Sequence, residues 1–77
     1  MARLKSFKEL KKERNSLHSD AESTYTVFSD DAGNRYLQID TYGSKERKLI
    51  GKVSQSIQLD QRGAYALRAL IDKAFPS

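Results

Sequence analysis

Aromatic rings and cationic side chains occur close together between residues 28 and 52 of this 77-residue chain. Aromatic rings stack on the faces of unpaired bases, and lysine and arginine bind phosphate groups. We therefore predict a binding surface made of aromatic, amide and basic side chains. The candidate residues are Phe28, Arg35, Tyr36, Gln38, Tyr42, Lys45, Arg47, Lys48 and Lys52.

Side chains that commonly carry catalysis or hold metals are scarce. The chain has no cysteine and one histidine, His18, which lies in a polar stretch without a partner for nucleophilic or metal chemistry. Asp30 and Asp31 are typical of a turn, and Asp40 stands without a second carboxylate in a strand pattern. We therefore expect no catalytic residue, no metal site and no cofactor, and we predict that the protein is not an enzyme.

Three strands are predicted from residue 24 onward. Residues 24–29, 35–42 and 52–59 are rich in β-branched and aromatic residues or alternate apolar with polar side chains. Residues 30–34 have the composition of a turn, so the first two strands form a hairpin. Residues 43–51 are a polar, basic connection bracketed by two glycines.

A C-terminal helix is predicted over residues 61–74. Its apolar side chains follow helical spacing, Asp60 is a good N-cap, and Pro76 ends the pattern. The chain therefore has the pattern of an α+β fold. An antiparallel β-meander of three to four strands is covered by this amphipathic helix.

Alternation along the strands gives the sheet two different faces. The apolar face is predicted to hold Tyr25, Val27, Leu37, Ile39, Val53, Ile57 and Leu59, together with the polar Gln55. The polar and aromatic face is predicted to hold Thr24, Thr26, Phe28, Tyr36, Gln38, Asp40, Tyr42, Lys52, Ser54, Ser56 and Gln58. We expect the helix to cover the apolar face and to leave the other open as a stacking platform. In the alternative, that face packs against the N-terminal segment or a second subunit.

The N-terminal segment is the most basic part of the chain. Residues 1–14 carry six basic and two acidic side chains, an excess that equals the net charge of +4. Ser6 and Glu9 have capping-box spacing and predict a short basic helix over residues 7–17. We divide the chain into this N-terminal helix or arm, residues 1–19, and a single domain, residues 20–77.

Size and composition indicate the setting in which the protein works. An apolar content of 38% is low for a chain this short to close its own core, so we expect a homodimer. No apolar run approaches the roughly 20 residues that span a bilayer, and no secretory h-region follows the N-terminus. We therefore expect an intracellular protein, cytoplasmic or nucleoid-associated, without a membrane partner.

The run YLQIDTYG, followed by GKVSQSIQLDQRGAYALRALI, resembles the positive cofactor four family of transcriptional-coactivator-like, single-stranded DNA-binding proteins. The resemblance covers about 45–50 of the 77 residues. It implies a curved antiparallel sheet, a helix used in dimerisation, and two sheets that form a nucleic-acid channel. The family fold has four strands, whereas three are clear in this sequence.

These observations predict a non-catalytic protein that binds single-stranded DNA or RNA with little sequence preference. The alternative is a small protein-binding module or inhibitor, of phage or mobile-element type, that acts on a partner protein. A third hypothesis is that the N-terminal basic helix binds duplex DNA.

Overall fold

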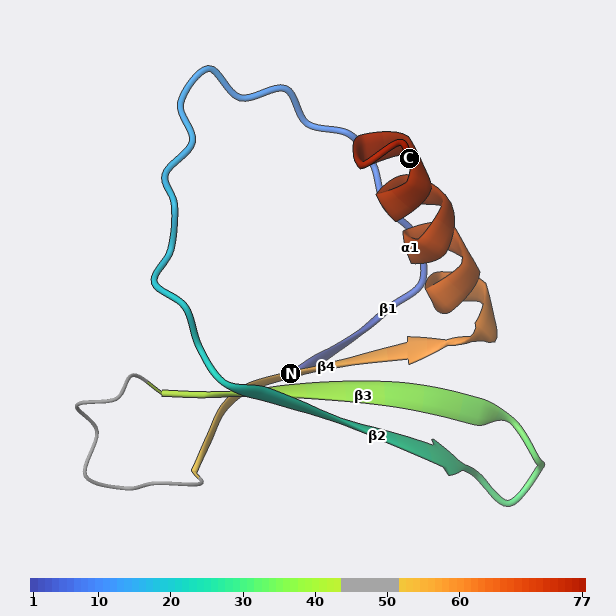
Figure 1. Cartoon of the computed structure of the whole chain (residues 1–77). Helices are drawn as coiled ribbons and strands as arrows, with labels where there is room; N and C mark the ends of the chain where they lie inside the picture. The colour runs from blue at the N-terminus through green and yellow to red at the C-terminus, as the bar shows by residue number, and fades with distance from the viewer. Residues whose placement is uncertain (44–51) are drawn as a thin grey trace.

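The computed structural model describes residues 1–43 and 52–77, which form a four-stranded sheet with one helix packed on it (Figure 1). The elements are β1 (Ala2–Leu4), β2 (Ser23–Ser29), β3 (Arg35–Tyr42), β4 (Val53–Asp60) and α1 (Gln61–Ala74). The strand order is β1-β4-β3-β2. Strands β2, β3 and β4 form the predicted antiparallel meander, and β1 adds to it in parallel with β4. The prediction of an α+β fold with a helix on a sheet is confirmed.

The β2–β3 hairpin is closed by a turn that its sequence specifies. Gly33 has a φ of 86°, a conformation that residues with a side chain rarely adopt. The Gly33 amide donates to the Asp30 carbonyl over 3.1 Å, and the Asp30 amide donates to the Asn34 carbonyl over 3.0 Å. A type I turn followed by a left-handed glycine is a common three-residue hairpin loop, so this turn fixes the β2–β3 register.

Helix α1 starts directly after β4, where Asp60 ends the strand and caps the helix. The Asp60 side chain accepts a hydrogen bond from the Gly63 amide over 2.8 Å. Because strand and helix share this residue, α1 folds back over one face of the sheet (Figure 1). It covers the face that holds Leu37 and Leu59, as predicted.

The hydrophobic core under α1 is small. Leu59 is 2% exposed and is the one fully buried hydrophobic side chain among the described residues. Cross-strand pairing places Leu37 on one side of it and Leu4 on the other. Several large apolar side chains stay exposed, including Tyr25 on β2 and Phe75 at the end of α1.

The prediction of an N-terminal helix over residues 7–17 is wrong. Residues 5–22 form an irregular arch on the α1 side of the sheet, and the preceding residues form β1 (Figure 1). A helix this short is marginal unless its apolar side packs on something, and here Leu10 and Leu17 are 74% and 100% exposed. The fourth strand therefore comes from the extreme N-terminus and is parallel to β4, which makes the sheet mixed.

Candidate functional site

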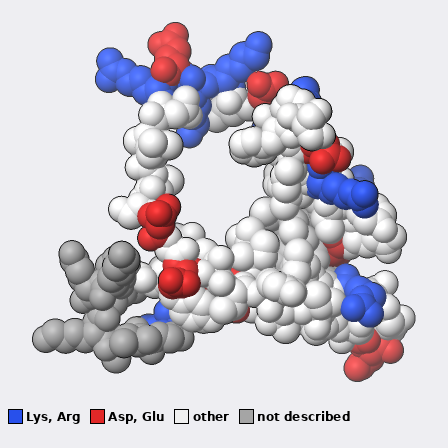
Figure 2. Space-filling model, viewed as in Figure 1, with Lys and Arg blue, Asp and Glu red and all other residues white. Residues whose placement is uncertain are grey.

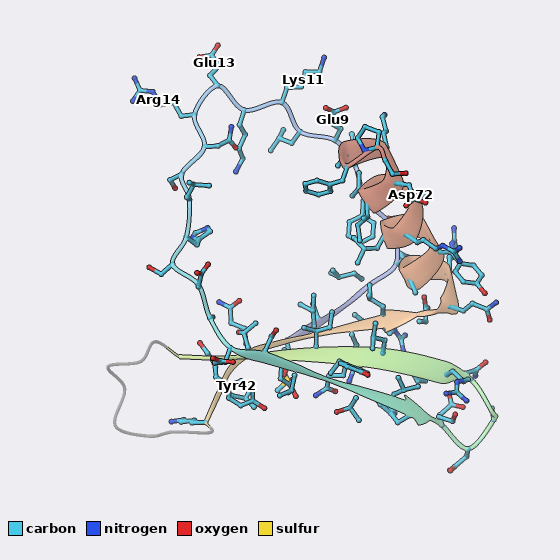
Figure 3. All side chains as sticks on the ribbon, viewed as in Figure 1. Glu9, Lys11, Glu13, Arg14, Tyr42 and Asp72 are labelled. Atoms are coloured by element: carbon cyan, nitrogen blue, oxygen red, sulfur yellow. The ribbon has the colours of Figure 1, made fainter. Side chains whose placement is uncertain are left out.

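The sheet face opposite α1, called the open face below, carries all three aromatic residues predicted to bind. Opposed residues on paired strands share a face, so the register defines its members. They are Arg3 of β1, Thr24, Thr26 and Phe28 of β2, Tyr36, Gln38, Asp40 and Tyr42 of β3, and Val53, Ser56, Gln58 and Asp60 of β4. Tyr42 points away from the side on which α1 lies (Figure 3).

An aromatic pair lies at the end of the open face nearest the hairpin turn. Phe28 and Tyr36 are directly opposed, and their rings stack with centroids 5.5 Å apart and planes inclined by 29°. The Arg3 guanidinium carbon lies 5.6 Å from the centre of the Tyr36 ring, which is within cation–π range. A flat aromatic surface and a cation therefore lie together here, with Phe28 still 36% exposed.

Asp30 holds the Tyr36 side chain in position. The Tyr36 hydroxyl donates to Oδ2 of Asp30 over 3.0 Å. Oδ1 of the same carboxylate accepts from the amides of Ala32 and Asn34 over 3.0 and 2.9 Å, and the Asn34 side-chain amide donates to Oδ2 over 3.1 Å. The residue that closes the turn therefore also orients the aromatic pair.

These hydrogen bonds shift the pKa of both partners. The Asn34 side-chain and backbone donors, with smaller contributions from Tyr36 and Ala32, lower the pKa of Asp30 below its ordinary value of 3.8. The hydrogen bond to Asp30, and to a lesser degree desolvation and the carboxylate's charge, raise the pKa of Tyr36 above 10.0. The stabilisation from Asp30 is present above its unfolded pKa and is lost as the pH falls through the folded one. The stabilisation from Tyr36 is present below pH 10.0, the ordinary pKa of tyrosine, and is lost as the pH rises through the folded-state pKa of Tyr36.

We predict that Tyr36 ionises above pH 10 and that Asp30→Asn moves this ionisation back toward the ordinary value. The substitution removes the negative charge that disfavours a phenolate and weakens the hydrogen bond that holds the neutral phenol. Carbon-13 NMR of labelled tyrosine rings, with the Tyr36 resonance assigned, measures this titration directly. A wild-type Tyr36 that titrates at or below pH 10 contradicts the hydrogen bond.

The middle of the open face is a connected set of polar side chains. Gln58 donates through Nε2 to Oε1 of Gln38 over 2.9 Å, and Gln38 donates through its own Nε2 to Oδ1 of Asp40 over 3.0 Å. The Ser56 hydroxyl also donates to Asp40. Asp40 therefore accepts hydrogen bonds from its own strand and from β4. These groups satisfy one another, which keeps this part of the face flat and its side chains fixed.

The other end of the open face is formed by Tyr42 and Thr24, whose hydroxyl oxygens lie 2.9 Å apart. The pairing of β3 with β4 shifts register between Thr41 and Tyr42, so Tyr42 lies opposite Val53. The prediction that Val53 continues the alternation of Ile57 and Leu59 on the apolar face is therefore wrong, because a β-bulge interrupts it.

The predicted binding residues do not all gather on one face. Phe28, Tyr36, Gln38 and Tyr42 lie on the open face, as listed above. Arg35 is paired with Ser29 and precedes Tyr36 on the same strand, so alternation directs it to the other face. Lys52 is exposed directly before β4. The predicted contacts at Lys45, Arg47 and Lys48 lie outside the described residues.

Two residues that complete the aromatic end are absent from the predicted set, namely Arg3 and Asp30. Arg3 reaches Tyr36 because β1 pairs with β4, and no local sequence pattern indicates that pairing. The basic side chains of the arch lie on the α1 side of the sheet, away from the open face; Lys11 and Arg14 are labelled among them (Figures 2 and 3). On the described part of the open face, Arg3 is therefore the cation beside the aromatic pair.

Within residues 1–43 and 52–77, no group of three or more His, Cys, Asp or Glu side chains is arranged to hold a metal ion. In the same part of the chain, no helix is long and apolar enough to cross a membrane. Comparisons with protein-family models, with curated proteins and with solved structures found no match for this chain. The resemblance to the positive cofactor four family therefore stays a prediction from sequence.

Proposed function

We propose that the protein is a non-catalytic single-stranded nucleic-acid-binding protein and that bases stack on the Phe28–Tyr36 pair of the open face. The observation that carries the proposal is this stacked, partly exposed pair with Arg3 held beside it, on a face that α1 leaves uncovered. Every base offers a π-face, so binding of this kind tolerates many sequences. It is proposed to act inside the cell, in the cytoplasm or at the nucleoid.

The platform has charges of both signs beside it: the Asp30 carboxylate accepts from the Tyr36 hydroxyl, and the Arg3 guanidinium lies over the Tyr36 ring. Arg3 lies close enough to Tyr36 to meet the phosphate of a nucleotide whose base stacks there. Asp40 occupies the middle of the face, and its charge disfavours phosphates at that position. We therefore expect the backbone to follow the edges of the sheet, near Arg3 and Lys52, with the bases directed inward.

Tyr36→Ala is expected to weaken binding of a fluorescently labelled 20-nucleotide single strand about 5- to 150-fold, which corresponds to the roughly 1–3 kcal/mol that stacking contributes per base. Fluorescence anisotropy at low and moderate salt measures the affinity, with the matching duplex as competitor. Affinity for the single strand should exceed that for the duplex and should fall as salt rises. Arg3→Gln should make the salt dependence shallower by about one unit of slope.

Tyr65→Ala is the matched control, because Tyr65 is a 61% exposed tyrosine on α1, away from the open face. It removes the same side chain and should leave the affinity unchanged. Equal losses for the two variants, or an affinity for the single strand that does not depend on salt, contradict the proposal. Circular dichroism of each variant separates loss of binding from loss of folding.

The alternative function, a module that binds a partner protein, is favoured by the apolar side of α1. Ile71, and Phe75 at the C-terminal cap one turn later, are 48% and 77% exposed, so large apolar side chains on this side of the helix remain uncovered. If the labelled strand does not bind at any salt concentration, this alternative replaces the first. Partner capture by the wild type, abolished by Phe75→Glu, then tests it.

A further inference from the structure

In the described part of the chain, β2 is a long edge strand without the usual protection against pairing. All seven of its residues are exposed, and its sequence, STYTVFS, contains no charge and no proline. Monomeric proteins commonly protect such edges with charged residues, prolines, bulges or covering elements. We propose that β2 pairs with β2 of a second copy of this chain, antiparallel and about a two-fold axis at Thr26, so that two sheets become one.

The backbone groups needed for this pairing point outward at alternate residues. The Tyr42 amide donates to the Glu22 carbonyl, and the Asp30 amide donates to the Asn34 carbonyl, each over 3.0 Å. Even-numbered residues of β2 therefore direct their backbone groups toward β3, and odd-numbered residues direct theirs to the free edge. A register centred on Thr26 opposes odd residues with odd residues, so every outward amide and carbonyl of the strand gains a partner.

The side chains are self-complementary in the same register. Tyr25 lies opposite Val27 of the second copy on the apolar face, and Thr24 lies opposite Phe28 of the second copy on the open face. Thr26 meets Thr26. Aromatic with β-branched pairs and threonine pairs are among the favourable cross-strand combinations, and no charges are opposed within the strand. This register also pairs all seven residues of β2 with one another. Just outside the strand, Glu22 lies opposite Asp30 of the second copy, and this like-charge pair disfavours pairing beyond the seven residues.

The single chain exposes more surface than a compact monomer of its size. Its accessible area is 7585 Å² and its radius of gyration is 14.9 Å. A folded monomer of 8.8 kDa is expected to expose about 4,800 Å², and 77 residues to have a radius of gyration of about 11 Å. The excess is larger than the roughly 800 Å² that each partner buries in an interface of standard size. Residues 5–22 are all exposed and account for part of this excess, and the exposed β2 edge adds to it.

An open apolar groove lies beside β2 on the apolar face. It runs between α1 and the sheet, has a volume of about 300 Å³, and is lined among others by Val27, Leu37, Leu59 and Tyr65. The proposed register puts Tyr25 of the second copy opposite Val27, at the side of the groove that α1 leaves open. Pairing thus continues the apolar floor of the groove into the second copy and shields Val27, which is 47% exposed in the single chain.

Cysteine cross-linking can test this register. The natural chain has no cysteine, so an introduced thiol can form a disulfide only with the same residue of a second copy. Thr26→Cys places two thiols opposite each other in a non-hydrogen-bonded pair, where Cα atoms lie about 4.5 Å apart and a disulfide forms readily. Thr24→Cys is the matched control on the same strand and face. In this register the two cysteines at residue 24 are offset by four residues along the strands, so their Cα atoms lie about 13 Å apart, beyond the limit of about 7 Å for a disulfide.

We expect the wild type to sediment as a dimer, and Thr26→Cys to form a disulfide-linked dimer at least tenfold faster than Thr24→Cys under mild oxidation. Non-reducing electrophoresis and intact mass measure the rates, and circular dichroism under reducing conditions verifies that both variants are folded. A monomeric wild type at about 100 µM overturns the proposal. So do equal cross-linking rates, since a dimer formed through α1 gives no preference for residue 26. The inference does not depend on nucleic-acid binding.

Discussion

Leu59→Ala is expected to leave a large fraction of the molecules unfolded at 25 °C. Leu59 is 2% exposed and lies in β4 between its paired neighbours Leu37 and Leu4, under α1. Truncating a buried leucine to alanine costs about 2–5 kcal/mol, because the transfer free energy is lost and a cavity remains. A core in a domain this small rarely supplies more than about 3–5 kcal/mol. The single substitution therefore removes most of the available stability.

Leu70→Ala is the matched control, because it makes the same chemical change on α1 at a side chain that is 43% exposed. We expect it to cost less than about 1 kcal/mol, since little apolar surface is returned to water and alanine favours the helix. Urea unfolding followed by circular dichroism gives both free energies of unfolding. A Leu59→Ala midpoint close to that of the wild type means that the core lies elsewhere.

The elements with local signals could be predicted from the sequence. The helix over residues 61–74 has its cap, its apolar spacing and its terminating proline within 17 residues, and the observed α1 has the same bounds. The hairpin has Asp30 and Gly33 at the positions that its turn requires. Strand β3 likewise matches the predicted residues 35–42. In each case the forces that form the element act between neighbours in the sequence.

Strand β1 could not be predicted in the same way. Three residues are too few for a periodic pattern, and the pairing of β1 with β4 joins segments more than 50 residues apart. The capping-box spacing of Ser6 and Glu9 is a local signal for a helix, but the apolar side chains Leu10 and Leu17 stay exposed and the helix does not form. Because β1 is absent from the prediction, Arg3 is also absent from the predicted partners of Tyr36.

Two structural features, the orientation of Arg35 and the role of Gly63, could have been predicted from the sequence. Adjacent residues on a strand face opposite sides, so Arg35 does not join Tyr36 on the open face. Gly63 is a glycine inside a helix, where it costs about 0.5–1 kcal/mol relative to alanine. Such a cost suggests close approach of another backbone, and the structure supplies one at Leu4.

Gly63→Ala is therefore expected to displace β1 from the sheet. A Cβ atom at residue 63 collides with the Leu4 carbonyl oxygen, which is backbone and has no rotamer to change. Helix α1 is not free to yield, because Asp60 both ends β4 and caps the helix. Overpacking of this kind costs about 1–3 kcal/mol, whereas glycine to alanine within a helix normally stabilises by about 0.5–1 kcal/mol. A decrease in the free energy of unfolding therefore indicates that α1 contacts the Leu4 backbone at residue 63, and an increase indicates that it does not.

Ala69→Gly, at an exposed position of the same helix, gives the ordinary propensity for comparison and should cost about 0.5–1 kcal/mol. Amide hydrogen exchange in Gly63→Ala should accelerate at residues 2–4 while β2 and β3 keep their protection. An unfolding midpoint above that of the wild type contradicts the contact. Displaced β1 also takes Arg3 away from Tyr36, so the affinity for a single strand should fall with a shallower salt dependence. A substitution buried beneath the N-terminus and remote from the open face would then weaken binding through the position of one strand.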